Sequence, residues 1–252
     1  APAPLHAAVS SHYFGGGFYP KGGGGAIPRA FIRALRRAGG EIRVKTPVSS
    51  VLMEGRRAVG VRLADGTEVS ATNVISNADP HMTFERLVGR EHLSRRLRSK
   101  LARTDYSISA ISLFLATDVD ARAHGLDSGN VWYYEHNDID ALYRLPFTRE
   151  GMAVEDIPGF FLTVTTLKDP SKNYGRTHTM EAFSFVNWSL FREWATSKFG
   201  DRPEGYAKLK ALLKERMLRA VGKIIPRIEK HEVFADVATP LPNLHYDAAT
   251  DG

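Results

Sequence analysis

One stretch of the chain, from Phe18 to Pro80, constrains the fold more than any other because its local signals follow one another in a defined order. The consecutive glycines Gly22 to Gly25 lead into Pro28, which suits the first turn of a helix because an N–H would be unpaired there. Beyond Pro28, apolar residues recur at three- and four-residue spacing and arginines fall on the opposite side. The pattern predicts an amphipathic helix with one apolar and one basic face, ended by Gly39-Gly40.

After this helix the sequence predicts a series of short strands. Ile42 and Val44 alternate with charged residues, as in a half-buried strand. The pair Asp65-Gly66 is a favoured hairpin turn between two further strands. The expected strands cover residues 42–45, 48–53, 58–63, 67–71 and 74–76. The stretch therefore has the order glycine loop, helix, strand, strand, hairpin, strand.

The motifs of this stretch resemble the middle of the phytoene-desaturase-like flavoproteins. That family includes carotenoid desaturases, carotenoid isomerases and retinol saturases, within the wider amine-oxidase-like group of FAD enzymes. The matching motifs are Tyr19-Pro20-Lys21-Gly22-Gly23, Gly39-Gly40-Glu41, Thr46-Pro47-Val48-Ser49-Ser50-Val51, Gly60-Val61-Arg62-Leu63-Ala64-Asp65-Gly66 and Val74-Ile75-Ser76-Asn77-Ala78-Asp79-Pro80. Further along, Leu167-Lys168-Asp169-Pro170-Ser171 and Ala238-Thr239-Pro240-Leu241 are also similar to family segments, with lower specificity.

The resemblance implies an arrangement of domains. Residues 1–20 are expected to lead in from a substrate domain, 21–84 to form part of a FAD-binding α/β domain, 85–235 to form the substrate-binding domain, and 236–252 to begin the return to the FAD-binding domain. The family's dinucleotide fingerprint and its last FAD-contacting segment have no counterpart in the sequence. We therefore expect the central part of a larger flavoenzyme, inactive by itself and without bound FAD.

The second half of the sequence predicts a different kind of unit. Strands rich in aromatic and β-branched residues indicate a mostly antiparallel sheet of four or more strands. A helix from Glu204 to about Val221 has one apolar face, and Pro226 ends it. The expected strands are 108–115, 131–134, 160–166 and 179–186, preceded by helices at 81–88 and 91–103. The fold class expected for the whole chain is α+β, α/β in part, with helices covering the sheet.

The glycine run also has to be tested as a phosphate-binding loop, because the N-terminus of a helix binds anions. A dinucleotide fingerprint requires Gly-x-Gly-x-x-Gly/Ala, and none of the glycine groups between Gly15 and Gly25 completes it. A Walker loop requires Gly-Lys-Ser/Thr after its glycines, whereas Lys21 precedes them. The alternative role, close backbone packing with positive φ, is the one we expect.

Composition limits the compartments and partners that we expect for the protein. The 252 residues include no cysteine, which excludes disulfides and thiolate chemistry and fits a reducing compartment such as the cytoplasm. The net charge of +6 and a pI near 9.5 arise partly from basic residues on the helix after the glycines and in residues 95–103. These are interpreted first as solvated helix faces and second as contact with a membrane surface. Nucleic acid is not expected as a partner, since no basic motif with interleaved aromatics is present.

Polar residues reveal no catalytic constellation. The nine histidines have no metal-ligand spacing, there is no Gly-x-Ser-x-Gly elbow, and the pairs Asp118/Asp120 and Asp138/Asp140 lie in turn-like surroundings. We therefore predict no metal site and name no catalytic residue. A flavin enzyme fits this result, because the cofactor carries the redox chemistry.

The resemblance also implies site residues. Val48 is expected to set its backbone against the adenine of FAD. An apolar tunnel for a long isoprenoid is expected along one face of the sheet, as an elongated groove continuous with Gly22 to Gly25, and adjacent strand residues point to opposite faces. The aromatic candidates are Trp132, Tyr133, Tyr134, Phe160, Phe161, Phe183 and Phe185, of which Trp132, Tyr134, Phe161, Phe183 and Phe185 are retained as lining residues.

The predicted function is that of a FAD-dependent oxidoreductase that desaturates, saturates or isomerises a hydrophobic isoprenoid or carotenoid. Two other classes remain open. One is a non-catalytic lipid- or partner-binding module, which would retain an apolar ligand without flavin. The other is an amine-oxidase-like flavoenzyme acting on amines or on a porphyrinogen, which would need a compact pocket with an aromatic cage or a carboxylate.

Overall fold

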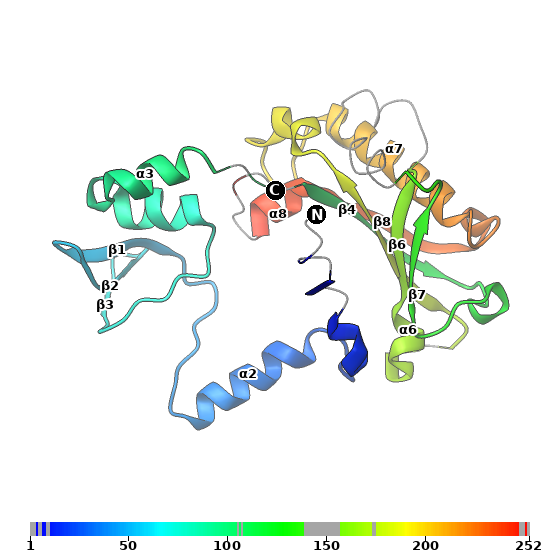
Figure 1. Cartoon of the computed structure of the whole chain (residues 1–252), viewed down its shortest axis with the longest axis horizontal. Helices are drawn as coiled ribbons and strands as arrows, with labels where there is room; N and C mark the ends of the chain where they lie inside the picture. Colours follow the sequence, from blue (N-terminus) through cyan, green and yellow to red (C-terminus); the bar gives the residue numbers. More distant parts are fainter. Residues whose placement is uncertain are drawn as a thin grey trace.

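The computed structural model describes residues 4, 7–8, 11–104, 106, 108–138, 157–172, 175–246 and 250. Within these ranges the chain forms two separate antiparallel sheets, one of three strands and one of five, with helices packed against each (Figure 1). The mixed α+β class expected from the sequence is confirmed. Of the predicted carboxylate pairs, Asp140 lies outside the described residues.

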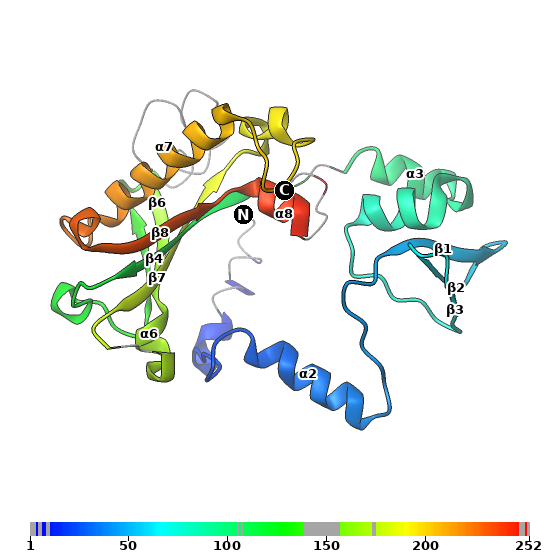
Figure 2. The same ribbon diagram turned by 180° about the vertical axis from the view of Figure 1, so that it is seen from behind.

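Helix α2 (Ala26–Arg37) follows the glycine loop, as the position of Pro28 predicts. Its apolar side chains remain exposed, with Phe31 72% and Ile27 52% accessible, and no residue of the helix is buried. Both views of the molecule show α2 standing apart from the two sheets (Figures 1 and 2). The amphipathic pattern therefore formed a helix whose apolar face has no cover among the described residues.

The three-stranded sheet consists of β1 (Val48–Glu54), β2 (Arg57–Leu63) and β3 (Glu68–Ser70), in the order β1-β2-β3. Both of its turns contain a glycine with positive φ, Gly55 at 60° and Gly66 at 90°, a backbone region that favours glycine. The predicted hairpin at Asp65-Gly66 is thus confirmed, and the Asp65 side chain accepts a 2.9 Å hydrogen bond from the Thr67 N–H.

Two of the predicted strands are wrong. Residues 42–45 and 74–76 form no strand, and neither pairs with a strand among the described residues. Val44 is 76% exposed and Ile75 is 94% exposed. A strand is maintained by hydrogen bonds to a neighbour, so an alternating pattern without a partner does not form one.

Helical segments pack on the three-stranded sheet. The first is a π-helix, η2 (Met82–Gly89), which contacts β1, and the second is α3 (Arg95–Leu101). Asp79 caps the first segment by accepting hydrogen bonds from the N–H groups of His81 and Met82, at 2.8 and 3.1 Å. Ser94 caps α3 through a 3.2 Å bond from the Leu97 N–H. The helix expected at 81–88 is thus present one residue further along the chain, and the one expected at 91–103 is present with shorter bounds.

The five-stranded sheet is antiparallel throughout and has the order β5-β6-β7-β4-β8. Its strands are β4 (Ser109–Thr117), β5 (Asn130–Tyr134), β6 (Gly159–Val164), β7 (His178–Val186) and β8 (Glu232–Ala238). The predicted strand at 160–166 ends at Val164, after which α6 (Thr165–Lys168) makes a single helical turn. Strand β8 and the short helix α8 (Pro240–Tyr246) that follows it were not predicted.

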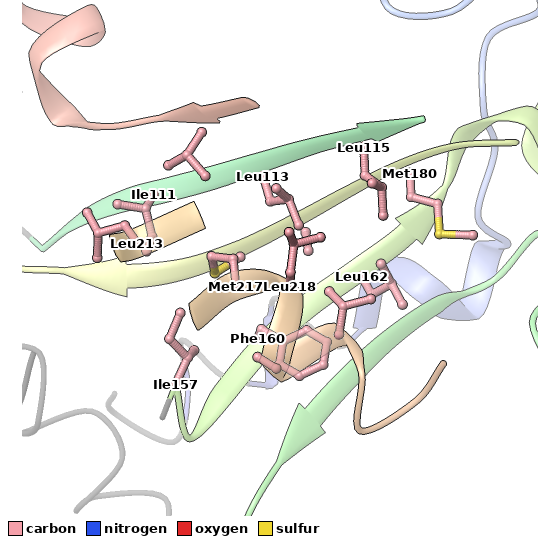
Figure 3. Packing of buried hydrophobic residues seen from close by; sticks show 14 of the residues in the cluster. Ile111, Leu113, Leu115, Ile157, Phe160, Leu162, Met180, Leu213, Met217 and Leu218 are labelled. Carbon is pink, nitrogen blue, oxygen red and sulfur yellow. The ribbon is translucent and has the colours of Figure 1, made fainter. Parts of the chain in front are cut away.

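Helix α7 (Glu204–Val221) has the bounds that the sequence predicts and covers one face of this sheet (Figures 1 and 2). Leu213 and Met217 from the helix meet inward-pointing residues of every second strand position, as Figure 3 shows. Strand β4 illustrates the alternation, since Ile111, Leu113 and Leu115 are at most 3% exposed. The main core of the described structure therefore lies on one face of the sheet, beneath α7.

No described helix is long and apolar enough to span a membrane.

Candidate functional site

The face of the five-stranded sheet that points away from α7 carries a group of aromatic side chains. Residues directly opposite one another on paired strands share a face. Trp132 on β5 pairs with Phe161 on β6, which pairs with Phe183 on β7. Tyr134 and Phe185 lie two positions along their strands and so point the same way. The structure thus places on one face all five residues retained from the sequence, Trp132, Tyr134, Phe161, Phe183 and Phe185, which we call the aromatic face.

The rings of the aromatic face contact one another directly. Phe161 and Phe183 stack with centroids 4.8 Å apart, and Trp132 meets them edge-on at 5.1 and 5.6 Å. Phe183 continues the contact to Phe185 at 6.0 Å. Such pairs add stability beyond the area that they bury. Yet the surface remains accessible, because Trp132 is 46% exposed and Tyr134 39%.

The two aromatic candidates that were not retained point into the core. Phe160 is 2% exposed, and its ring stacks on Tyr133 with centroids 5.1 Å apart. Both belong to the cluster beneath α7. Adjacent residues of β5 and β6 therefore divide between core and open face, as the period of a strand requires.

Three residues of the same face were missed by sequence reasoning: Phe114, Glu181 and Thr163. Register places Phe114 of β4 and Thr163 of β6 on either side of Glu181 on β7. The signal was present in β7, where Glu181 has the same parity as Phe183 and Phe185. A carboxyl group in an aromatic surface is unusual enough to be informative.

Glu181 and Thr163 both lack polar partners among the described residues. No hydrogen bond or ion pair from a described residue reaches the Glu181 carboxyl, and its burial raises its pKa above the ordinary value. Thr163 is 8% exposed, and its hydroxyl oxygen is buried without a hydrogen-bond partner in the described structure. Buried polar groups ordinarily have hydrogen-bond partners, so these two side chains can bind a further polar group.

The glycine loop is attached to one end of the same sheet. The N–H of Gly22 donates a 2.6 Å hydrogen bond to Oδ2 of Asp169, which follows α6. Asp169 is 4% exposed, and its other oxygen accepts bonds from the hydroxyl and N–H of Ser171, at 2.6 and 3.2 Å. Hydrogen bonds from Ser171 and then from Gly22 hold the Asp169 pKa below its ordinary value. Asp169 is thus an ionised clamp on the loop.

This clamp bears on the question of phosphate binding. The Gly22 N–H is already used, and the N–H groups of Gly23, Ala26 and Ile27 donate to carbonyls within the loop, at 2.9 to 3.2 Å. A carboxylate next to these groups repels another anion. The loop therefore fits close packing of the backbone, with Gly22 and Gly23 at φ of 89° and 75°, better than it fits a phosphate cradle.

A second contact joins the loop's aromatic segment to α6. Lys168 places its ammonium 6.0 Å from the ring centre of Tyr19 and donates a 2.8 Å hydrogen bond to the Ser128 carbonyl. Burial lowers the pKa of Lys168. The family-like segments at 19–23 and 167–171 are therefore neighbours in space.

Val48 begins β1, an edge strand of the three-stranded sheet, and is 37% exposed. Val48 pairs with Leu63 of β2, and a register shift between Val48 and Ser50 interrupts the regular ladder next to it. The Ser49 hydroxyl secures the neighbouring turn by donating to the carbonyls of Arg62 and Leu63, at 3.0 and 3.1 Å. Val48 thus lies partly exposed at a fixed place on an edge strand, and its expected contact with the adenine of FAD stays a prediction.

Two further observations concern metal binding and cavities. In the described ranges, no three His, Asp or Glu side chains gather in a way that could hold a metal ion. A hollow of about 410 Å³ lies between the first hairpin and the helices η2 and α3, apart from the aromatic face. Its lining includes Val51, Met53, Val74, Phe84, Val88 and Leu97.

The described chain thus combines a glycine loop fixed to a five-stranded sheet with an aromatic face and a separate three-stranded unit, an arrangement consistent with the flavoprotein resemblance of its sequence. Residues 6–137, more than half of the chain, match the model of the family described as flavin containing amine oxidoreductase. The chain belongs to this family.

Several curated relatives match nearly the whole chain. An all-trans-retinol 13,14-reductase from Danio rerio is 32% identical and the Homo sapiens protein of the same name 29%, each alignment covering 98% of this chain and 42% of the relative. A prolycopene isomerase from Daucus carota is 28% identical over 97% of this chain and 37% of its own length. The chain thus spans less than half the length of these relatives.

The fold has counterparts among solved structures. An oxidoreductase from Methanosarcina mazei superposes with a TM-score of 0.60 at 21% identity, covering 88% of this chain and 43% of that protein. The arrangement of sheets and helices is therefore shared with part of that protein.

Proposed function

We propose that this chain contributes the substrate-facing sheet of a FAD-dependent oxidoreductase that saturates, desaturates or isomerises a hydrophobic isoprenoid. The observation that carries the proposal is the aromatic face, which lies opposite the covered core and remains open. A conjugated isoprenoid has few hydrogen-bonding atoms, so a site for it offers apolar and π surface. Rings in contact from Trp132 through Phe161 and Phe183 to Phe185 supply such a surface across three strands.

The relatives support the same substrate class. Retinol and prolycopene, which appear in the names of the matching proteins, are both isoprenoid polyenes. Those proteins differ in reaction, one being a reductase and the other an isomerase. The polyene is the element that they share, and it is the element that an extended aromatic surface fits.

FAD, when bound to the whole protein, supplies the transfer of a hydride to or from the substrate. In this chain we assign the adenine contact to the backbone of Val48. Asp169 and Gly22 hold the glycine loop against the α6 end of the sheet, so they fix one boundary of the substrate surface. The elongated groove expected along this surface, continuous with Gly22 to Gly25, is part of the proposal.

Ligand binding by the whole protein tests the proposal. Purified protein should show a flavin spectrum, bind retinol and a carotenoid in an absorbance titration, and convert one of them anaerobically under a chosen redox state of the flavin. Phe183→Ala should weaken polyene binding about tenfold, from the loss of one stacked ring. Phe199→Ala is the matched control, because Phe199 is 42% exposed but lies outside the sheet. Equal polyene affinity in both variants would remove the aromatic face from the site.

Glu181 favours a second candidate, an amine-oxidising flavoenzyme, because a carboxylate among aromatic rings can bind an ammonium group. Its raised pKa opposes this function, since an amine site needs the ionised carboxylate. Oxidation of a panel of primary and secondary amines, with no response to polyenes, would establish the amine function instead. Retention of a polyene by protein without flavin would indicate a binding module.

A further inference from the structure

Glu181 occupies a defined place between the glycine loop and the aromatic rings. On the open face of β7 the order of side chains is Thr179, Glu181, Phe183 and Phe185, and Thr179 is nearest α6. The hydroxyl of Thr165 in α6 bonds that of Thr179 at 2.6 Å, which marks this end of the sheet. The carboxyl therefore lies between the clamped loop and the apolar surface.

The neighbours of Glu181 leave its carboxyl uncommitted. Phe114 faces it from β4 and Thr163 faces it from β6. Other titratable groups near this part of the sheet are engaged elsewhere. Asp236 of β8 lies beyond Phe114 and forms an ion pair with Lys210 at 2.7 Å. His178 forms a 2.9 Å hydrogen bond with Thr166 on the core side, and Lys168 donates a hydrogen bond to the Ser128 carbonyl. Tyr134 lies two strands away on β5.

The carboxyl of Glu181, unpaired among the described residues, lowers the stability of the folded protein, and a purely structural role for this residue would not explain that cost. A half-buried carboxyl without a partner destabilises its ionised form, and burial is the cause of the raised pKa of Glu181. Phe or Leu at this position would continue the apolar surface at no such cost. A perturbed carboxyl in a ligand-facing surface is the pattern of an acid–base group.

We infer that Glu181 is the acid–base group that exchanges a proton with the bound polyene, and that the hydroxyl of Thr163, which has no partner among the described residues, donates to this carboxyl once the polyene is bound and so positions it. This inference rests on the proposed function. A hydride carrier supplies no proton, so the proton has to come from another group, and Glu181 of this chain is the group assigned to it.

Glu181 can serve either direction of the reaction, as an acid or as a base. In saturation, the O–H bond of Glu181 breaks and the π electrons of a substrate C=C bond form a new C–H bond, leaving a delocalised carbocation and a carboxylate. Reduced flavin, when bound to the whole protein, would supply the hydride for the second C–H bond and so account for the electron pair. In desaturation the Glu181 carboxylate would take the proton as base, and bound oxidised flavin would supply the acceptor for the hydride. Isomerisation needs only addition of the proton, rotation about the bond and return of the proton, without net redox change.

The aromatic face supports this chemistry electrostatically. Ring faces attract cations, and the effect strengthens when water is excluded. Phe114 and Phe183 are the rings next to Glu181, so positive charge developing after protonation forms beside π surface. A carboxyl that is easily protonated, next to rings that stabilise the resulting cation, suits the transfer better than either feature alone.

The test uses the whole flavin-loaded protein and three measurements: polyene affinity, the rate of a single turnover, and deuterium incorporation at the reacting carbon in D₂O. Glu181→Gln keeps the shape but cannot supply the proton. We expect polyene affinity within about threefold of the unaltered protein and a single-turnover rate lower by about 100- to 10,000-fold. Glu181→Asp should restore part of the rate. Glu229→Gln, an exposed site off the sheet, is the matched control.

Thr163 is tested by its effect on pH dependence. Thr163→Val preserves the shape and removes the hydroxyl, so it should shift the pH limb assigned to Glu181 while leaving polyene affinity nearly unchanged. Thr163→Ser should return the limb to its original position. A Val variant with an unshifted limb overturns the positioning role.

The outcomes separate the inference from the proposed function. If the unaltered protein converts a polyene and Glu181→Gln does so at the same rate, Glu181 is not the acid–base group and the proposed function stands. If Glu181→Gln loses polyene affinity as much as rate, the carboxyl is a binding group and the inference is overturned. If the unaltered protein binds an amine through Glu181 and ignores polyenes, both are overturned.

Discussion

Oδ2 of Asp169 accepts a 2.6 Å hydrogen bond from the backbone N–H of Gly22, although 147 positions separate the two residues in the chain. Each belongs to a short segment that stands out in the sequence, one a run of glycines and the other an Asp-Pro-Ser turn. Their union fixes the glycine loop at the end of the five-stranded sheet, next to α6. Because the contact is a charge-assisted bond to a buried carboxylate, it should resist opening more than an ordinary loop contact does.

Removal of the Asp169 carboxylate should therefore release the loop. In Asp169→Ala we expect faster amide hydrogen exchange at Gly22 and Gly23 with little change in β4 or β7, because the core beneath α7 does not depend on the clamp. Asp127→Ala, which removes an acceptor for the local Gly129 N–H in another turn, provides the control. Unchanged exchange at Gly22 would show that other contacts hold the loop.

The clamp should also depend on pH in a known direction. The pKa of Asp169 is lower in the folded protein than its ordinary value, because Ser171 and Gly22 donate hydrogen bonds to the carboxylate. A lowered pKa means that the folded state binds the proton more weakly, so the contribution is present above the ordinary pKa and is lost as pH falls through the folded one. The protection of the Gly22 amide, measured down an acid series relative to the intrinsic exchange rate at each pH, should fall at the low end, and Asp169→Asn should abolish that fall.

Glu181 should show the opposite dependence. Its raised pKa means that the folded state holds the proton more tightly than the unfolded chain, so its contribution is present below the ordinary pKa of 4.5 and is lost as pH rises through the folded pKa. Glu181→Gln should therefore be more stable than the unaltered protein at neutral pH, with the difference shrinking as pH falls. Urea denaturation at several pH values measures this, and a constant difference would contradict it.

Core and open face should respond differently to the loss of a ring. Phe160→Ala deletes a side chain that is 2% exposed, and we expect it to lower the free energy of unfolding by about 3–5 kcal/mol. Phe114→Ala deletes one that is 43% exposed on the other face, and the loss should stay near 1 kcal/mol. Parallel denaturant titrations compare them. Similar losses would mean that the open face is packed as tightly as the core.

Val48 is predicted to act through its backbone. In the whole protein, Val48→Ala should retain nearly all bound flavin, whereas Val48→Pro, which deletes the N–H, should retain much less. Flavin absorbance per mole of folded protein gives the comparison, with circular dichroism to confirm that both variants fold. Equal flavin content would contradict a backbone contact, and a larger loss in the alanine variant would identify Val48 as a packing residue.

Patterns that depend on neighbouring residues in the chain predicted structure well. The helix from Glu204 to Val221 was predicted at its observed bounds because its apolar period and Pro226 are both local signals. The turn at Asp65-Gly66 was likewise predicted by its own two residues. By contrast, alternation at Ile42 and Val44 predicted a strand that does not form, because a strand depends on a partner that the local pattern does not specify.

The candidate site shows the same division. Parity along β5, β6 and β7 placed the five retained aromatic residues on one face, which the register confirms. Glu181 was overlooked because its importance comes from Phe114 and Thr163, which adjoin it only when β4, β6 and β7 pair. Strand β8 was missed because its apolar residues are mixed with Glu232 and Asp236, charges that an exposed edge tolerates.

The one-sided packing of the five-stranded sheet separates two kinds of selective pressure. Along β7, Met180, Ala182 and Val186 lie in the core, while Glu181, Phe183 and Phe185 lie on the open face. Substitutions at the second set can change the preferred ligand without disturbing the first. In a lineage with this architecture, the residues of β7 on the open face can therefore change with the ligand, while the alternating core residues keep the fold.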